Sequence, residues 1–234
     1  MNIKAIGFDI GQTLIQYNKP LNWKSLYRPA LEQVLSKCNI PITEDRILKG
    51  VDILSKYNTR INYREYEVSS DMIFTEILNR WDVDVEIIND VKSGFYLFFQ
   101  QEAHPFEDAI ELLTLLKNKE VKIGLLTDVA YGMDNIYSLS DIKDISKYID
   151  IALTSVDVGY RKPNERGFQL LLKGLNVTPE EMMFVGDEEK DIKGANDVGI
   201  CSVLINRDSI IKDYSQQHTI SNLLELLSIC GIQE

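Results

Sequence analysis

Histidine and cysteine are both scarce in this chain of 234 residues. The two histidines, His104 and His218, are too few for a histidine-rich metal site, and a catalytic triad built on histidine is not expected. The three cysteines, Cys38, Cys201 and Cys230, are widely spaced and form no CxxC pair. This spacing indicates reduced thiols and favours a cytoplasmic location.

Basic charge and long apolar runs are also lacking. There are 25 basic against 36 acidic residues, a net charge of -11, which argues against nucleic acid or a membrane surface as a partner. No apolar run approaches the roughly 20 residues that span a bilayer. Residues 1–4 lead directly into an expected strand, so no signal peptide is predicted. The length and the hydrophobic share of 44% suit one α/β domain with a smaller insertion, as a monomer or homodimer.

A short apolar run near the N-terminus, residues 3–8, ends in Asp9 and is followed by Gly11 and Thr13. An apolar run bounded in this way indicates a buried parallel strand with Asp9 at its carboxyl end. In open α/β sheets, ligands bind at that edge. Asp9 is therefore a candidate functional residue, although a strand followed by a capped turn would look the same.

The insertion, from residue 16 to about residue 101, is dominated by the helical period. Apolar residues recur on one face in successive stretches, which predicts a bundle of about four helices. Within it, residues 57–64 are unusually polar for the interior of a helix. Two interpretations are open: the stretch faces a cleft, or it is a solvated loop, and the solvated loop is the preferred interpretation.

Strand and helix patterns alternate through the second half of the chain, which implies a parallel sheet flanked by helices. The fold class predicted is therefore α/β. Strands are expected at 121–127, 149–154, 182–187 and 201–205, and helices at 104–116, 141–148, 167–175, 191–198 and 221–227.

Polar residues follow these apolar strands in a set order. Asp9, Thr127 and Asp187 all fall at carboxyl ends, and Lys162 and Asp191 fall in adjoining loops. Taken singly, each has a simple structural explanation, such as a capped turn or a solvated charge. Because parallel strands bring their carboxyl ends to one edge, the ordered set indicates a single site.

The sequence resembles the haloacid dehalogenase-like (HAD) hydrolase superfamily, whose four short motifs are all matched in order. Residues 8–13 (FDIGQT), 125–127 (LLT), 161–163 (RKP) and 186–191 (GDEEKD) are similar to the first to fourth motifs. The resemblance implies a Rossmann-like α/β core domain over 1–15 and 103–234. It also implies a smaller α-helical cap domain over 16–102.

The resemblance further implies a phosphatase that uses Mg²⁺ and acts on a small phosphorylated metabolite, such as a sugar or nucleotide phosphate. Asp9 would attack the phosphoryl group and form an aspartyl-phosphate that water then hydrolyses. Asp9, the Gly11 backbone carbonyl and Asp187 would hold the cation. Hard oxygen ligands of this kind suit Mg²⁺.

The other motif residues would bind and orient the substrate. Thr127 and Lys162 would contact the phosphoryl oxygens, and Lys162 would also screen the carboxylates. Asp128 is a candidate substrate contact beside Thr127. Asp191 would orient Lys162 or the water molecules on the metal, and Glu188 would support the site from the same loop.

Gly11 departs from the pattern of the family's phosphatases, which carry there an aspartate that protonates the leaving oxygen. General acid catalysis contributes typically about 10²–10⁴-fold, so the change matters. Water, the substrate or a cap residue would have to supply the proton. A phosphonatase-like enzyme using a cap lysine such as Lys49, and a non-catalytic phosphate-ligand binder, are the alternatives. Carbon–halogen cleavage is disfavoured because the dehalogenases carry tyrosine at this position.

Overall fold

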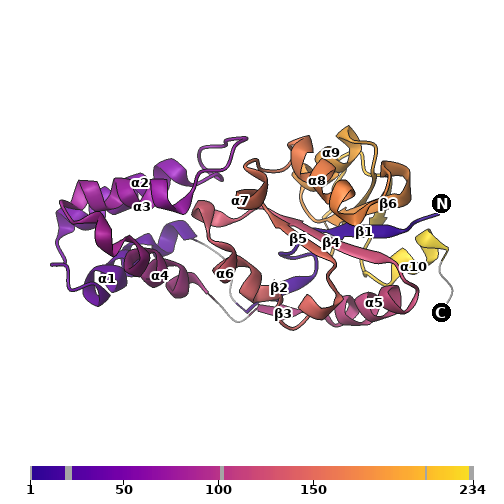
Figure 1. Cartoon of the computed structure of the whole chain (residues 1–234), viewed down its shortest axis with the longest axis horizontal. Helices are drawn as coiled ribbons and strands as arrows, with labels where there is room; N and C mark the ends of the chain where they lie inside the picture. The colour runs from indigo at the N-terminus through magenta and orange to yellow at the C-terminus, as the bar shows by residue number, and fades with distance from the viewer. Residues whose placement is uncertain (1, 19–22, 101–102, 209, 232–234) are drawn as a thin grey trace.

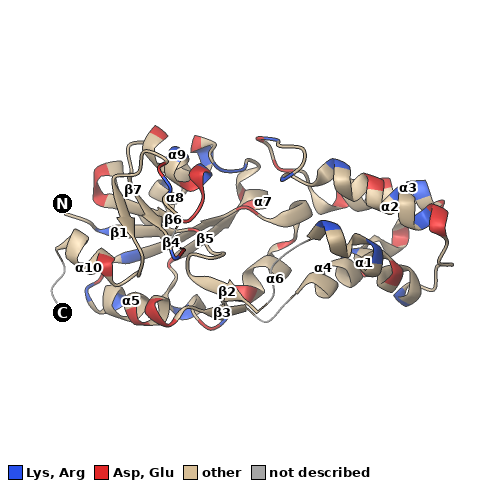
Figure 2. Cartoon of the chain, turned by 180° about the vertical axis from the view of Figure 1, so that it is seen from behind, with Lys and Arg blue, Asp and Glu red and all other residues tan. Residues whose placement is uncertain are grey.

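The protein has two parts, an α/β core and a helical cap, which lie at opposite ends of the long axis of the molecule (Figure 1). The structure is a computed structural model and describes residues 2–18, 23–100, 103–208 and 210–231. Charged residues of both signs are spread over the helices of both parts (Figure 2). Within the described residues, no helix is long and apolar enough to cross a membrane.

The core is built on a parallel sheet, which confirms the predicted fold class. Among the described residues it has six strands in the order β5-β4-β1-β6-β7-β8. The strands are β1 (Ala5–Phe8), β4 (Lys122–Thr127), β5 (Ile151–Thr154), β6 (Met182–Gly186), β7 (Cys201–Ile205) and β8 (His218–Ile220). The first strand therefore lies in the middle of the sheet, between β4 and β6.

Helices cover both faces of this sheet, because its strands are apolar on both sides. Helices α5 (Glu107–Asn118) and α10 (Glu225–Cys230) lie on one face, and α8 (Glu165–Leu175) and α9 (Glu189–Asp197) on the other (Figure 1). Along β1, Ile6 and Phe8 belong to the α5 side and Ala5 to the α8 side, as the period of two in a strand requires. On the α8 side, a Cβ on Gly124 would lie 2.7 Å from Leu171 Cδ1, so glycine lets the helix approach.

The cap consists of four helices within residues 23–100, as predicted. They are α1 (Trp23–Lys37), α2 (Glu44–Tyr57), α3 (Ser70–Trp81) and α4 (Ile88–Phe99). Thr43 and Ser69 cap α2 and α3 by accepting a hydrogen bond from the backbone amide three residues later, of Arg46 and Met72 respectively. Their apolar faces meet in a core of their own, in which Tyr27, Phe74, Trp81 and other large side chains are buried.

The cap cluster also takes in residues of the core segment that follows β4. Tyr131 is buried in it, with Ala130, Met133 and Tyr137 packed at its edge. The ring of Trp23 stacks on Phe99, with centroids 3.9 Å apart, and lies 5.5 Å from that of Tyr131. Two chain segments far apart in sequence therefore form one apolar core.

Several expected elements differ from those observed. Residues 141–148 form no single helix; short 3₁₀ turns, η3 (Leu139–Ile142) and η4 (Ser146–Tyr148), follow the single-turn helix α6 (Asn135–Ser138). Residues 104 and 105, expected to open a helix, instead lie in β3 (Ala103–Pro105), which pairs antiparallel with β2 (Ile15–Tyr17). The edge strand β8 and this two-stranded ribbon were not predicted, because runs of three residues are too short for periodicity to reveal.

Candidate active site

The carboxyl edge of the sheet brings together the polar residues that end its strands. Phe8 pairs with Leu125 of β4 and with Val185 of β6. Asp9, directly after β1, therefore lies at the carboxyl edge of the sheet. At the same edge, β4 ends in Thr127 and β6 is followed by Asp187. Thr127 is partly exposed at this edge, beside Thr154 of β5.

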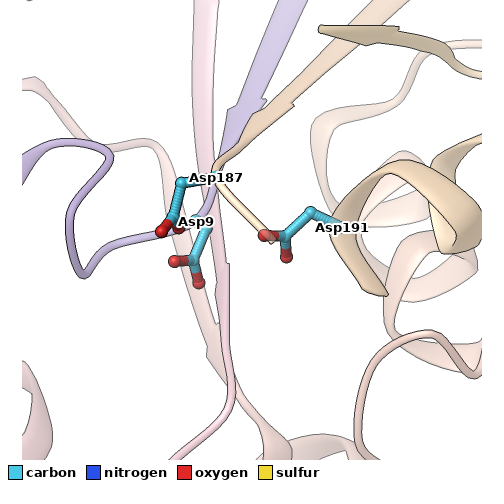
Figure 3. A group of neighbouring side chains, drawn as sticks. All are labelled: Asp9, Asp187 and Asp191. Carbon is cyan, nitrogen blue, oxygen red and sulfur yellow. The ribbon is translucent and has the colours of Figure 1, made fainter. Parts of the chain in front are cut away.

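Three carboxylates form the centre of the edge (Figure 3). Oxygen atoms of Asp9, Asp187 and Asp191 all lie within 4.8 Å of one another. Asp9 and Asp187 extend from neighbouring strand ends, and Asp191 points toward them from the first turn of α9 (Figure 3). Burial, together with the charges of Asp9, Asp191 and Glu188, raises the pKa of Asp187 to about 7.

This group has the chemistry of a site for a hard divalent cation. Carboxylate oxygens are the ligands that Mg²⁺ prefers, and a cation would offset the repulsion that raises the pKa of Asp187. Thr13 Oγ1 donates a long hydrogen bond of 3.5 Å to Asp187 Oδ1 and helps to hold it. The residues present therefore fit Mg²⁺.

Lys162 is the cation that the structure itself places among these carboxylates. Its Nζ lies 2.5 Å from Asp9 Oδ1 and 2.7 Å from Asp191 Oδ1, and it donates to the carbonyl of Leu126 at 3.0 Å. Only 2% of its side chain is exposed. Although burial opposes the charge, Asp191 and Asp9 raise the pKa of the Lys162 ammonium, so it stays protonated beside Asp9.

Asp191 can approach Lys162 because the residue that ends β6 is glycine. A Cβ on Gly186 would lie 2.4 Å from the Cβ of Asp191, closer than real atoms come. Asp191 is fully buried, and its Oδ2 accepts a hydrogen bond of 3.1 Å from the amide of Glu188, which fixes the first turn of α9. The glycine thus sets the position of the carboxylate that holds Lys162.

Asp128 and Glu188 lie around a second lysine, Lys190, which the sequence analysis did not single out. Lys190 Nζ lies 3.1 Å from Asp128 Oδ2 and 2.7 Å from Glu188 Oε2. Asp128 also accepts a hydrogen bond of 3.0 Å from the amide of Lys162. Against the effect of burial, Lys190 lowers the pKa of Glu188 to about 2, with a further contribution from Arg60. These contacts orient the Lys162 loop.

A loop of the cap, residues 58–69, lies against the core beside Lys162. The amide of Glu67 donates to the carbonyl of Gly159 at 3.0 Å, and the amide of Arg161 donates to the carbonyl of Glu65 at 2.8 Å. The Glu67 carboxylate, 3% exposed, forms an ion pair with Arg161 and accepts a hydrogen bond of 2.6 Å from Ser155 Oγ. The loop and the Lys162 segment thus form a short antiparallel bridge between cap and core.

This loop confirms the preferred interpretation of residues 57–64 as a solvated loop, because residues 58–64 lie in no helix or strand and residues 60–63 are exposed. Arg60 pairs with Glu188 at 3.1 Å, and Arg64 donates to the carbonyl of Tyr57 at 2.7 Å and pairs with Glu67 at 3.3 Å. Arg60 and Tyr63 are 81% and 68% exposed, whereas the side chain of Arg64 is 10% exposed, so the stretch faces solvent except at Arg64. Sequence pattern could flag the polar run, but not the contact of Arg60 with Glu188, which lies 128 residues away in the chain.

The cap lysine considered for a phosphonatase-like reaction is engaged elsewhere. Lys49 Nζ forms an ion pair of 2.6 Å with Asp45, one turn earlier on α2. Gly11, by contrast, lies in the site, in the turn after Asp9, where it forms a bridge with Ile15. The structure therefore brings Gly11 together with Asp9, Thr127, Lys162 and the acidic residues of the fourth motif.

Comparisons with known proteins agree with this arrangement. The sequence profile of haloacid dehalogenase-like hydrolases matches residues 3–199. A glyceraldehyde 3-phosphate phosphatase of Methanothermobacter thermautotrophicus is 25% identical, over 99% of this chain and 97% of its own. A phosphoglycolate phosphatase of Salmonella paratyphi A is 24% identical, over 86% of this chain and 81% of its own.

Solved structures share the fold over nearly the whole chain. A HAD phosphatase from Thermococcus onnurineus has a TM-score of 0.64 at 22% identity, covering 99% of both chains. A 2-haloacid dehalogenase from Pseudomonas syringae has a TM-score of 0.73 at 20% identity, covering 98% of both chains. With the family profile matched over most of its length, this chain belongs to the haloacid dehalogenase-like hydrolases.

Proposed function

We propose that this hydrolase is a phosphatase that acts on a small alkyl phosphate through an aspartyl-phosphate. The observation that carries the proposal is the position of Asp9, between the buried ammonium of Lys162 and the carboxylate of Asp187. A phosphoryl group that entered there would meet a nucleophile and a fixed positive charge together.

The chemistry follows from these side chains. A carboxylate oxygen of Asp9 attacks phosphorus, the bond to the leaving oxygen breaks, and water later hydrolyses the acyl phosphate and restores Asp9. Lys162 would have to exchange part of its contact with Asp9 for the phosphoryl oxygens, which Thr127 would contact from β4. Bound Mg²⁺, held by Asp9, Asp187 and the Gly11 carbonyl, would neutralise charge on the phosphoryl oxygens.

The remaining residues of the site position Lys162. Asp191 holds its ammonium and Asp128 holds its backbone amide, so a nearly rigid lysine faces the nucleophile. Such preorganised charge stabilises a transition state more than a mobile charge would. For Asp128 we therefore favour a positioning role over direct contact with an anionic substrate.

The substrate class rests on the cap and on the relatives. The cap loop closes on the Lys162 segment through Glu67 and Arg161, which suits a short leaving group. The relatives named above are phosphatases of glyceraldehyde 3-phosphate and phosphoglycolate, both small alkyl phosphates. A phosphonatase-like reaction is less well supported, since Lys49 is paired with Asp45.

Phosphate release from three esters tests the proposal: 4-nitrophenyl phosphate, phosphoglycolate and glyceraldehyde 3-phosphate. We expect release with Mg²⁺, no release with EDTA, and no release by Asp9→Asn, which keeps the shape of the nucleophile. An exposed carboxylate offers the matched control, Asp144→Asn, which should behave as the unaltered protein. Metal-independent release, or full activity of Asp9→Asn, would refute the mechanism. Stabilisation by inorganic phosphate without turnover would indicate a binding protein.

A further inference from the structure

The side chain of Tyr17 lies next to the space that a side chain at position 11 would occupy. A Cβ built on Gly11 would lie 3.7 Å from Tyr17 Cε2 and 3.9 Å from the Tyr17 hydroxyl oxygen, and no other described heavy atom outside its chain neighbours comes within 4 Å. The phenol of Tyr17 thus borders the space into which an acid at position 11 would extend. This space adjoins Asp9, the nucleophile of the proposed reaction.

The chain path places Tyr17 there by short-range structure. The turn after Asp9 is closed by hydrogen bonds from Gln12 to Ile15 and from Leu14 to Ile10, and it brings β2 back beside Gly11. Tyr17 is two residues beyond Ile15, so both side chains lie on the same side of this strand. Pairing of Tyr17 with Ala103 of β3 fixes the strand between the two connections to the cap.

Asp141, from the turn η3 of the core, holds the Tyr17 hydroxyl. The hydroxyl donates to Asp141 Oδ2 at 3.3 Å. Burial raises the pKa of Asp141 to about 6 against the effect of this hydrogen bond, so the carboxyl is partly protonated near neutral pH. A protonated Asp141 can donate to the phenol oxygen, which frees the phenol hydrogen to point elsewhere.

We propose that the hydroxyl of Tyr17, oriented by Asp141, protonates the leaving oxygen in place of the acid missing at Gly11. This inference rests on the proposed phosphatase function. Tyr17 would be a catalytic residue and Asp141 a positioning residue. The acid would then come from the ribbon that leads into the cap and not from the first motif.

The proton balance closes over the two half-reactions. When Asp9 attacks phosphorus, the bond to the leaving oxygen breaks with its electron pair on oxygen, and Tyr17 gives its proton to that oxygen. The phenolate then takes a proton from the water that attacks the aspartyl-phosphate, which restores Tyr17 as phosphate and Asp9 separate. Burial and the neighbouring Asp141 raise the pKa of the Tyr17 phenol above its usual range. An alkoxide is nevertheless a stronger base than the phenolate, so the first transfer runs in the required direction.

The test compares an alkyl ester with an aryl ester, because 4-nitrophenolate departs without a proton. For Tyr17→Phe, which keeps the ring, we expect the ratio of kcat for phosphoglycolate to kcat for 4-nitrophenyl phosphate to fall about 100-fold. For Asp141→Asn the ratio should fall in the same direction by less. The control is Tyr148→Phe. The hydroxyl of Tyr148 forms a hydrogen bond with Thr114 on an exposed part of the core, so its removal should leave the ratio unchanged.

A rescue separates chemistry from folding. Gly11→Asp in the Tyr17→Phe background returns a carboxyl to the usual position, where its Cβ meets only ordinary contacts, and should raise the ratio again at least tenfold. An unaltered ratio in Tyr17→Phe, with both esters hydrolysed by the unaltered protein, would overturn this inference alone. Failure of the unaltered protein to hydrolyse either ester would refute the proposed function and this inference with it.

Discussion

The carboxylate of Glu67 and the guanidinium of Arg161 form a buried ion pair that joins the cap to the core one residue before Lys162. Their side chains are 3% and 8% exposed. The pair therefore connects the position of the cap loop to the segment that carries the cation of the site.

Removing the charge of Glu67 should destabilise the protein and open the loop. Glu67→Gln leaves Arg161 buried with a weakened partner, and breaking a buried pair costs about 3–5 kcal/mol, less where the new side chain still accepts hydrogen bonds. We expect a loss of about 2 kcal/mol in the free energy of unfolding by urea, with a raised KM. Lys49→Gln, which breaks an exposed pair, should cost under about 1 kcal/mol. Equal losses in both variants would contradict the prediction.

A methyl group on Gly186 should disturb the site without touching substrate. The added Cβ would displace Asp191, and through it Lys162 would shift. Misplacement by about 1 Å can lower the rate about 100-fold, so we expect a fall in kcat of that order for Gly186→Ala. The control is Gly94→Ala on α4, whose Cβ would meet Val34 at an ordinary 3.4 Å. Unchanged kcat in Gly186→Ala would show that Asp191 need not hold its position.

Asp187 should determine the affinity for metal. In Asp187→Asn one carboxylate of the cluster becomes neutral, so titration calorimetry with Mg²⁺ alone should show binding weakened by at least about tenfold. This measurement needs no substrate and is independent of turnover. Asp144→Asn serves again as the control on an exposed turn. Equal Mg²⁺ affinity in Asp187→Asn and the unaltered protein would place the cation elsewhere.

Asp141 should make stability depend on pH in a defined direction. Its pKa is raised from 3.8 to about 6 in the folded protein, so protonation favours the folded state. The contribution is fully present below the unfolded value and is lost as pH rises through about 6. Asp141→Asn cannot ionise, so its stability relative to the unaltered protein should increase between about pH 5 and about pH 8, as measured by urea unfolding. A difference that is constant over this range would contradict the prediction.

The sequence predicted those parts of the molecule that follow local rules. The α/β fold is confirmed, because long apolar runs ending in polar residues specify buried parallel strands whatever their partners are. For the same reason, residues at strand ends such as Asp9 and Asp187 could be assigned to one edge before any geometry was known. The short ribbon of β2 and β3 has too few residues to show a period, and it was missed.

The parts of the site that escaped prediction depend on contacts between distant segments. Glu67 is one acidic residue among many until the fold places it against Arg161, 94 residues later. Tyr17 likewise reads as an aromatic residue of a linker, and only the turn at Gly11 shows what it borders. The absence of an acid at Gly11 was visible in the sequence, whereas the group that fills its space was not.

Trp23 of the cap and Tyr131 of the core segment lie in one apolar cluster, with tilted rings 5.5 Å apart, and this contact bears on how such proteins can be recombined. The apolar interior of the cap includes side chains from the segment after β4, so residues 16–102 expressed alone would lack part of their own interior. A chimaera that exchanged caps between relatives would have to carry residues 130–137 along with the helices. If the helical insertion alone were exchanged, its apolar interior would contain a cavity where Tyr131 packs. The core domain would in turn expose the aromatic side chains of residues 130–137.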